Sequence, residues 1–364
     1  MVNDQTTNVM KKIFIIHYSL FLALVASAQS PFISRVWEYC PAPGQFVNEL
    51  PAYELGDDAN TMRLKAEEAI ADDQRGMITL GGWGGYVLFG FDHMVPNIAD
   101  QNDFIVLGNA FYSASCEEEE GRRGGSCEPG IVLVSYDANG NGQPDDAWYE
   151  LAGSEYANKS TIHDYAVTYF RPAIGHEATP SQVTPALIDT TYIRWQDNHS
   201  AMGYLSQLSF HTQPYFPEWI ELDSMTFTGA RLPDNYRDLS GNGTNYVLYS
   251  YPWGYADNHP NTDQRAELDI DWAVCDDGTP ANLPGIHFVK VYTAVHQQCG
   301  WIGETSTEIM GAIDLHCHTA VSNASAEPTE KAIYTITGVR VSDPLPHSVY
   351  ILREGNRVEL KIQK

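Results

Sequence analysis

The sequence contains few basic residues for its length. Its 364 residues include 21 Lys and Arg but 47 Asp and Glu, which gives a formal net charge of -26 at pH 7. A protein this acidic repels the phosphates of nucleic acids and anionic membranes, so both are excluded as main partners. The excess carboxylates either form a solvated acidic surface or gather to hold divalent cations, and the two arrangements are compatible.

Sequence motifs of common catalytic sites are also missing. The chain has no Gly-x-Ser-x-Gly elbow, P-loop, HExxH motif or dinucleotide fingerprint. A carboxylate pair for glycoside hydrolysis stays open, because such a pair is defined by its separation in space. We therefore assign no catalytic residues and expect a binding protein rather than an enzyme.

No long apolar run follows the N-terminal segment. The first 28 residues combine two lysines, an apolar stretch over residues 13–25 and the small-residue sequence Ala26-Ser27-Ala28. This pattern predicts a signal peptide over residues 1–28, and the apolar stretch is too short to span a bilayer. We expect a protein that is secreted or displayed on the cell surface, without a transmembrane segment.

Cysteines are few, and all of them follow residue 28. Because an exported protein meets oxidising conditions, disulfides are their expected state. The most local pair is Cys116 with Cys127, which would close the polar loop between them, and the other pairings stay open. The six cysteines are Cys40, Cys116, Cys127, Cys275, Cys299 and Cys317.

Short runs of β-branched and aromatic residues recur along the chain, separated by Gly, Asn, Asp and Pro. Such runs are typical of β-strands, and they do not alternate with helices as in a doubly wound α/β fold. The predicted strands lie at residues 77–80, 86–91, 104–107, 131–136, 165–170, 224–228, 246–249 and 288–293. We therefore predict a mainly β fold, a jelly-roll or related β-sandwich with a large insertion or second β-rich lobe at about residues 171–245.

The remaining segments suggest the domain organisation. Residues 60–70 are good helix formers with Asn60 as a candidate N-cap, so we predict one helix there. Small polar residues at 321–331 predict a linker, and residues 332–364 predict a small C-terminal β module with three short strands. The main β domain is accordingly expected over residues 29–320.

Residues 137–146 carry oxygen-bearing side chains at alternate positions. Asp137, Asn139 and Asn141 stand at positions one, three and five, and Gly142 stands at position six, as in calcium loops. Trp148 occupies the position of the usual bidentate Glu, so either a weaker structural site or an Asx-rich turn without an ion fits the pattern. We predict Ca²⁺ as the cofactor, since oxygen ligands favour it. The predicted ligands are Asp137, Asn139, Asn141, Gln143, Asp145 and Asp146.

Aromatic residues occur in turn-rich segments beside Asp, Asn and Gly, most densely at residues 251–259. Exposed rings beside polar amides suit sugars or flat ligands with polar edges, whereas core packing is the alternative for each ring. We predict five ligand-binding residues: Trp253, Tyr255, Asp257, Asn258 and Trp301.

Several motifs resemble a family of Bacteroidetes proteins known as cell surface proteins. The resemblance extends over about residues 34–318, and the surroundings of Asn109 and Glu128 are also similar to galactose-binding-like jelly rolls. The family resemblance implies a secreted or surface protein with relatives in corrinoid (vitamin B12) uptake loci. Its motifs lie at residues 34–48, 80–86, 108–111, 128–130, 145–156 and 299–304.

The C-terminal residues resemble the sorting domain of type IX secretion cargo. The resemblance rests on residues 333–334, Gly338-Val339-Arg340-Val341 and residues 349–352. It implies passage through the outer membrane and contact with secretion or outer-membrane uptake machinery.

Together these observations predict a calcium-stabilised secreted or surface-displayed protein that binds a glycan or a small nutrient such as a corrinoid. A glycan-active hydrolase is the first alternative. An adhesive or structural surface protein is the second.

Overall fold

The computed structural model describes residues 29–317, apart from residues 75, 115–117 and 119–120, together with four strands of the C-terminal region. The chain divides into two compact units, and residues Gln29–Cys317 form the larger one, which we call the body. The predicted signal peptide over residues 1–28 lies outside the described residues, as does the predicted linker except its last residue.

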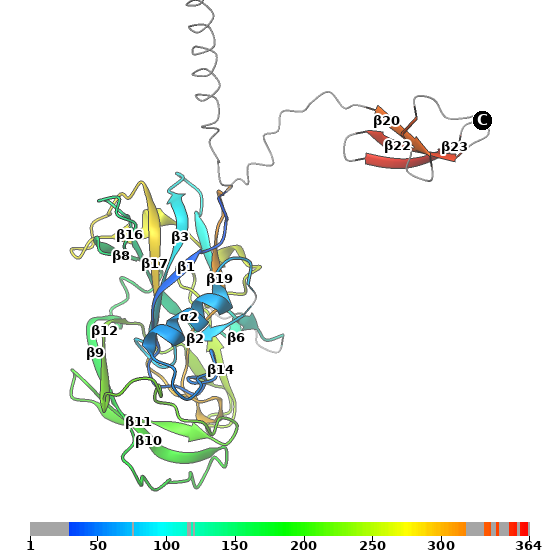
Figure 1. Cartoon of the computed structure of the whole chain (residues 1–364). Coiled ribbons are helices and arrows are strands. Elements are labelled where there is room, and N and C mark those ends of the chain that lie inside the picture. The colour runs from blue at the N-terminus through cyan, green and yellow to red at the C-terminus, as the bar shows by residue number, and fades with distance from the viewer. Residues whose placement is uncertain are drawn as a thin grey trace, which may run out of the picture. The chain divides into compact units, whose positions relative to one another are not determined.

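A six-stranded antiparallel sheet forms the centre of the body (Figure 1). Its strands β3 and β17 are the longest and pair along most of their length. In spatial order the strands are β1 (Arg35–Cys40), β3 (Tyr86–Pro96), β17 (Gly285–Thr293), β7 (Gly130–Ser135), β8 (Trp148–Leu151) and β16 (Ala273–Val274).

Side chains alternate between the two faces of the central sheet, as the pleat of a strand requires. On β7, Val132 and Val134 belong to one apolar core, whereas Ile131 and Leu133 pack in a second core. A strand that is apolar on both faces must be covered on both faces, so the body has a layer on each side of this sheet.

The first core is covered by the helix α2 (Ala59–Ile70) and by two short sheets. Met62, Ala66 and Ile70 are four residues apart and face the core, which confirms the predicted helix. Its N-cap is Asp58 rather than Asn60, since Asp58 Oδ1 accepts the backbone N–H of Thr61 at 2.8 Å. The short sheets contain β15 (Glu267–Leu268), β4 (Phe104–Leu107) and β19 (Gly311–Asp314), and β18 (Glu308–Ile309) with β2 (Ile78–Thr79).

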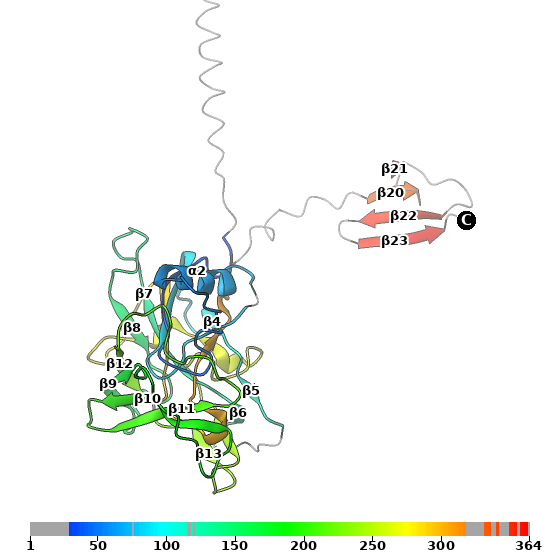
Figure 2. The same ribbon diagram turned by 60° about the horizontal axis from the view of Figure 1, so that its bottom comes forward.

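The second core is covered by a four-stranded antiparallel sheet (Figure 2). Tyr165, Val167 and Tyr169 alternate along its strand β9 and are buried in this core. The predicted insertion at about 171–245 supplies the other three strands of this sheet, and β9 itself precedes the insertion. In spatial order the strands are β11 (Met202–Leu208), β10 (Leu187–Asp197), β9 (Ile162–Phe170) and β12 (Ser224–Arg231).

A further four-stranded sheet and three short 3-10 helices complete the body. The sheet contains β13 (Tyr236–Asp238), β14 (Tyr246–Tyr249), β6 (Gly124–Ser126) and β5 (Phe111–Tyr112). The 3-10 helices are η1 (Gln264–Ala266), η2 (Ile270–Trp272) and η3 (Gly300–Ile302).

The C-terminal unit contains an antiparallel sheet in the order β21, β20, β22, β23. The sequence predicts three short strands in this region, and the structure has four. Their bounds are β20 (Lys331–Thr335), β21 (Arg340–Val341), β22 (Val349–Glu354) and β23 (Arg357–Ile362).

The prediction of a mainly β protein is confirmed. The strands form several small antiparallel sheets packed around the six-stranded one. Each strand run predicted for the body from its apolar pattern overlaps a strand of the structure, because burial of the strand's side chains sets that pattern in whichever sheet the strand lies.

The expectation of disulfides is wrong for the described cysteines, which are all free thiols. Cys127 is fully buried, and its Sγ contacts the carbonyl oxygen of Arg123 at 3.8 Å rather than another sulfur, so the predicted pair with Cys116 is not formed. Burial raises the pKa of the Cys40 thiol to about 11 and that of the Cys299 thiol to about 12. Cys116 itself lies outside the described residues.

Candidate functional site

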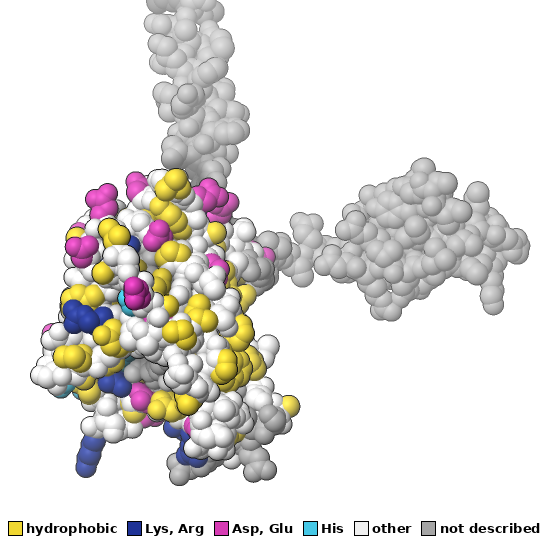
Figure 3. Space-filling model, turned by 90° about the horizontal axis from the view of Figure 1, so that it is seen from below, with side chains coloured by type: hydrophobic (Ala, Val, Ile, Leu, Met, Phe, Trp, Pro, Cys, Tyr) yellow, Lys and Arg dark blue, Asp and Glu magenta, His cyan; other side chains and the backbone are white. Residues whose placement is uncertain are grey.

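An open groove of about 580 Å³ lies on the surface of the body. Four large apolar side chains in its lining are strongly exposed, with exposed fractions of 58% for Phe111, 65% for Phe210, 51% for Leu239 and 46% for Trp301. Apolar side chains are also exposed in patches on the face seen in Figure 3. We call the groove lined by these four residues and Tyr246 the aromatic groove.

Segments far apart in the sequence meet at the aromatic groove. Phe111 belongs to β5, Phe210 follows β11, Tyr246 begins β14 and Trp301 lies in η3. The indole Nε1 of Trp301 donates to the carbonyl oxygen of Thr244 at 3.2 Å, which fixes the ring beside the β13–β14 loop. Polar groups of His211, Asn245 and Ser126 lie among the rings. The groove therefore combines flat apolar surfaces with hydrogen-bonding groups.

Three acidic side chains are buried together inside the body. Glu128, Asp257 and Glu308 are 8%, 3% and 1% exposed, and one carboxylate oxygen from each lies within 4.8 Å of the others. Glu308 stands on β18, Glu128 precedes β7, and a backbone hydrogen bond from Glu128 to Asp257 joins their segments at 2.9 Å. We call these three residues the carboxylate centre.

Asp257 holds the chain segment that leads into the aromatic groove. Its Oδ1 accepts the backbone N–H groups of Asn109 and Ala110, both at 2.8 Å, and its Oδ2 accepts that of Glu308 at 3.0 Å. The close contact between the Asp257 carboxylate and this backbone segment requires glycine at position 108, because a Cβ there would lie 2.2 Å from Asp257 Oδ1. Phe111 follows this segment directly and is thereby positioned in the groove.

The other carboxylates accept hydrogen bonds from neutral donors. Glu308 Oε1 accepts the hydroxyls of Ser306 at 2.5 Å and Thr79 at 3.1 Å, and its Oε2 accepts the side-chain amide of Asn109 at 3.3 Å. Glu128 Oε2 accepts the hydroxyl of Ser126, a groove residue, at 3.4 Å. These donors stabilise the carboxylates without supplying a compensating positive charge.

Glu304 supports a second wall of the aromatic groove. It is 1% exposed, and its Oε1 accepts the backbone N–H of Gln45 at 2.5 Å. The Gln45 side-chain amide donates to the carbonyl oxygens of Ile302 at 3.0 Å and Glu304 at 3.1 Å. Gln45 and Ile302 both line the groove, so this buried acid joins two segments of its wall.

Burial raises the pKa values of these acids. Loss of hydration raises the pKa of Glu308 to about 7 and that of Glu304 to about 8. Burial also raises the pKa of Glu128 well above its usual value, as do the neighbouring Glu308 and Asp257. The carboxylate centre therefore either retains protons near neutral pH or holds a hard divalent cation, which oxygen ligands would suit.

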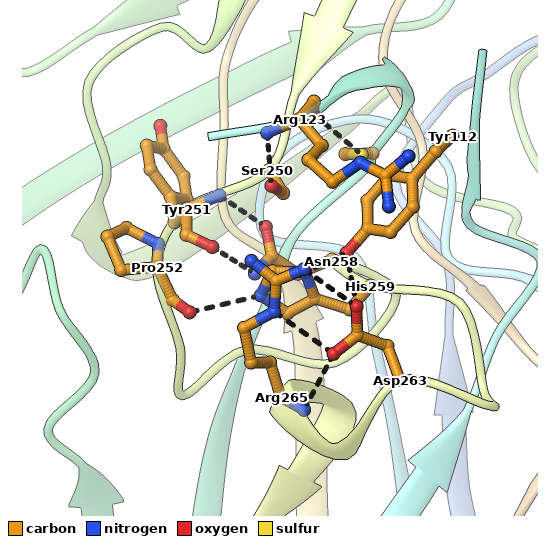
Figure 4. Close-up of polar contacts among 10 residues, drawn as sticks. Tyr112, Arg123, Ser250, Tyr251, Pro252, Asn258, His259, Asp263 and Arg265 are labelled. Atoms are coloured by element: carbon orange, nitrogen blue, oxygen red, sulfur yellow. Dashed lines mark hydrogen bonds and ion pairs between the residues drawn. The ribbon is translucent and has the colours of Figure 1, made fainter. Parts of the chain in front are cut away.

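A polar network fixes β5 from the side opposite to Phe111 (Figure 4). Tyr112 Oη lies 2.6 Å from His259 Nδ1 and 3.0 Å from Asp263 Oδ2, and Arg265 donates to the same carboxylate oxygen at 2.7 Å. Burial, with Arg265 nearby, lowers the pKa of His259 to about 4, so the ring is neutral at pH 7. The guanidinium of Arg123 lies 4.2 Å from the centroid of the Tyr112 ring.

A second, more polar cavity of about 310 Å³ lies over the central sheet. Its lining includes Glu150 of β8 and Lys290 of β17. Burial raises the pKa of Glu150 to about 7 and lowers the pKa of Lys290, whose Nζ lies 3.8 Å from the centroid of the Tyr86 ring. Glu150 is the one carboxylate among the residues that line this cavity.

The structure brings one of the five predicted ligand-binding residues to the aromatic groove, namely Trp301. Trp253 is 38% exposed and packs at a tilt against Trp272, outside the groove lining. Asp257 belongs to the carboxylate centre. These placements separate the predicted set into different parts of the body.

Tyr255 and Asn258 are interior residues, which corrects their prediction as ligand-binding residues. Tyr255 is 1% exposed and its Oη accepts the backbone N–H of Glu155. Asn258 is fully buried, and its side chain forms hydrogen bonds with both the N–H and the carbonyl oxygen of Tyr251. Their side chains stabilise the 251–258 turn because buried polar groups require such partners.

The predicted calcium ligands lie together on the exposed loop between β7 and β8. Asp137 Oδ1 accepts the N–H of Gly140 at 2.7 Å, and its Oδ2 accepts that of Gly142 at 2.8 Å. The side-chain amides of Asn139 and Asn141 both donate to Asp145. Gln143 contributes its backbone N–H to Asn141 Oδ1, and Asp146 Oδ2 accepts the N–H of Ala138. The oxygen-bearing side chains thus converge within the loop.

Sequence reasoning singled out Asp257 but assigned no role to Glu304 or Glu308, the other acids that organise the groove. Glu308 follows Thr305, Ser306 and Thr307 and precedes Ile309, so it is a lone charge in a segment of small and apolar residues. Glu304 lies only three residues after Trp301. An isolated acid in a segment expected to be buried is the available signal, but it does not reveal which partner it meets.

Comparison of the chain with protein-family models finds no match, and comparison with curated proteins finds none either. Among the described residues, no helix is long and apolar enough to cross a membrane.

Replacing Glu308 with Gln is expected to remove part of the pH dependence of stability. Burial raises the Glu308 pKa from 4.5 to about 7, so the folded protein binds this proton more tightly than the unfolded chain. The free energy of unfolding should therefore fall as the pH rises from about 4.5 to about 7, by on the order of 3 kcal/mol for such a shift. Denaturant unfolding at a series of pH values measures this fall in both proteins.

The matched control for this experiment is Glu221→Gln, which neutralises an exposed carboxylate. If the free energy of unfolding falls equally steeply with pH in Glu308→Gln and in the unmodified protein between pH 4.5 and pH 7, the carboxylate centre does not hold a proton on Glu308. A calcium-induced rise in thermal midpoint that only Glu308→Gln lacks would indicate a cation there instead.

Proposed function

We propose that this protein binds a glycan in the aromatic groove and does not transform it. The observation that supports the proposal is the exposure of Phe111, Phe210 and Trp301 around one groove beside amide and hydroxyl groups. Sugar rings present apolar C–H faces and hydroxyl edges, and such a surface matches both. The groove volume of about 580 Å³ lies within the range of small-ligand sites.

The burial of the acids supports binding over hydrolysis. A glycosidase needs two carboxyl groups that reach the scissile bond from opposite sides. Glu304 and Glu308 are each 1% exposed, and the second cavity offers only Glu150 in its lining. A glycan-active hydrolase is therefore the second candidate function, with Glu150 of the second cavity, whose pKa is raised by burial, as its candidate acid, and an adhesive or structural role is the third.

A corrinoid is the other ligand class that the sequence resemblance suggests. Its macrocycle and nucleotide loop make it larger than typical drug-sized ligands, so it would engage the aromatic groove with only part of its surface. The exposed rings of Phe210 and Trp301 suit sugars better because each offers a separate flat face of hexose size. Cobalamin belongs in the binding test for this reason.

Export to the cell exterior forms part of the same proposal. It is supported by the signal-peptide pattern over residues 1–28 and by the resemblance of the C-terminal strands to type IX sorting domains. The Bacteroidetes family resemblance, the contact with outer-membrane machinery and the jelly-roll topology stay predictions of the sequence.

We also propose that the 137–146 loop binds Ca²⁺. The proposal is supported by the convergence of Asp137, Asn139, Asn141 and Asp145 on one another within a glycine-containing turn. The loop connects β7 to β8 of the central sheet, so an ion there would stabilise that connection. Affinities of about 10⁻⁴–10⁻³ M are typical of extracellular calcium modules.

Trp301→Ala is expected to weaken glycan binding by about tenfold or more, since a tryptophan at the centre of a site commonly contributes over ~1.4 kcal/mol. Trp253→Ala is the matched control, because Trp253 is similarly exposed but lies outside the groove. Calorimetric titration against a glycan panel and cobalamin measures both variants. The proposal fails if the two substitutions weaken binding equally or if a bound glycan is cleaved.

Asp137→Ala is expected to reduce the rise in thermal midpoint that calcium produces. An ion at about ten times its dissociation constant stabilises the folded state by ~1.4 kcal/mol, which is lost without the ligand. Differential scanning calorimetry in millimolar CaCl₂ and in excess chelator gives the calcium increment for each protein. An increment of the same size in Asp137→Ala and the unmodified protein would mean that the loop is an Asx-rich turn without an ion.

A further inference from the structure

A histidine, an aspartate and a cysteine meet at one end of the described body. His93 lies on β3, Asp314 ends β19, and Cys317 is the last residue of the body. One ligand atom from each lies within 4.8 Å of the others. His93 and Asp314 are 9% and 4% exposed, and Cys317 is half-buried. Imidazole nitrogen, carboxylate oxygen and thiolate sulfur form a ligand set that zinc accepts.

The hydrogen bonds of His93 place a carboxylate at each of its ring nitrogens. Nδ1 lies 2.6 Å from Asp92 Oδ1, and Nε2 lies 2.8 Å from Asp314 Oδ2. A neutral imidazole carries one ring proton, so it can donate to only one of these oxygens. The other nitrogen then directs a lone pair at a carboxylate. A cation placed between Nε2 and Asp314 Oδ2 would be coordinated by both atoms.

The contact with Asp92 favours the cation. Metal-bound histidines almost always donate their second ring N–H to a carboxylate or carbonyl, which fixes the tautomer and the orientation of the ring. Asp92 provides that partner at Nδ1 and leaves Nε2 as the ligand atom. Asp314 is held in a similar way, since its Oδ1 accepts the N–H of His316 at 2.7 Å while Oδ2 faces His93.

Metal–ligand distances fit this arrangement after a small movement. Zinc binds nitrogen and oxygen at about 2.0–2.2 Å and sulfur at about 2.3 Å, so ligands in a tetrahedron stand about 3.3–3.7 Å apart. The contact between His93 and Asp314, now 2.8 Å, needs to open by about half an ångström or slightly more to reach that spacing. The Cys317 Sγ lies 3.4 Å from the Gln29 carbonyl oxygen and can turn from it toward the ion.

We propose that His93 Nε2, Asp314 Oδ2 and the Cys317 thiolate bind one zinc ion, with Asp92 orienting the histidine. Metal binding releases the thiol proton to solvent and involves no redox step. The ion joins β3 of the central sheet to the segment after β19, and so pins the point where the chain leaves the body. This inference does not depend on the glycan-binding proposal, because none of these residues lines the aromatic groove.

The test uses the full-length reduced protein and Co²⁺ as a spectroscopic substitute for zinc. We expect one equivalent of metal to produce the thiolate-to-cobalt charge-transfer absorption, which the oxygen-only 137–146 loop cannot give. Zinc should displace the cobalt and abolish the band. Cys317→Ser should abolish the band without unfolding the protein, because Cys317 lies at the end of the body and is half-buried.

Two further variants sharpen the result. Asp92→Asn should weaken zinc binding by roughly 10–100-fold while retaining the band at saturating metal, as loss of an orienting partner does. Cys275→Ser is the matched control, a half-buried thiol outside the cluster, and should leave metal binding unchanged. Absence of the band in the unmodified protein, or its persistence in Cys317→Ser, would overturn the proposal.

Discussion

Buried carboxylates that accept backbone N–H groups are the interaction on which the candidate site depends. Loops cannot satisfy their own amides as strands do, and an unpaired buried amide is costly. Asp257 accepts the amides of Asn109 and Ala110, and Glu304 accepts that of Gln45. These loops carry Phe111 and Gln45 into the aromatic groove. The acids thus give irregular segments a fixed position that regular secondary structure would otherwise provide.

The same acids impose an electrostatic constraint. Like charges in a medium of low polarity raise one another's energy, and the donors around Glu128 and Glu308 are neutral. The body therefore depends on protons or a cation to neutralise its interior, although its surface is strongly acidic overall. His93 presents a related problem, because its two ring nitrogens both face carboxylates.

Periodicity in the sequence predicted the helix at residues 60–70 and the main strands, because burial on a sheet or helix face imposes a local pattern. It could not predict which loops meet. Gln45 and Glu304 are 259 residues apart, so only the tertiary fold joins them. Trp301, predicted as a ligand-binding residue, lines the aromatic groove, whereas Tyr255 and Asn258 from the same predicted set are buried. An aromatic or amide in a turn-rich segment has the same local pattern whether it faces solvent or core.

Residue-resolved amide hydrogen exchange tests the central claim most directly. If the buried acids hold the groove loops, the amides of Gln45, Asn109 and Ala110 will exchange nearly as slowly as amides of the central strand β17, because all open only when the body unfolds. Exchange of these three amides at the rate of freely exposed loop amides, while β17 stays protected, would contradict the account.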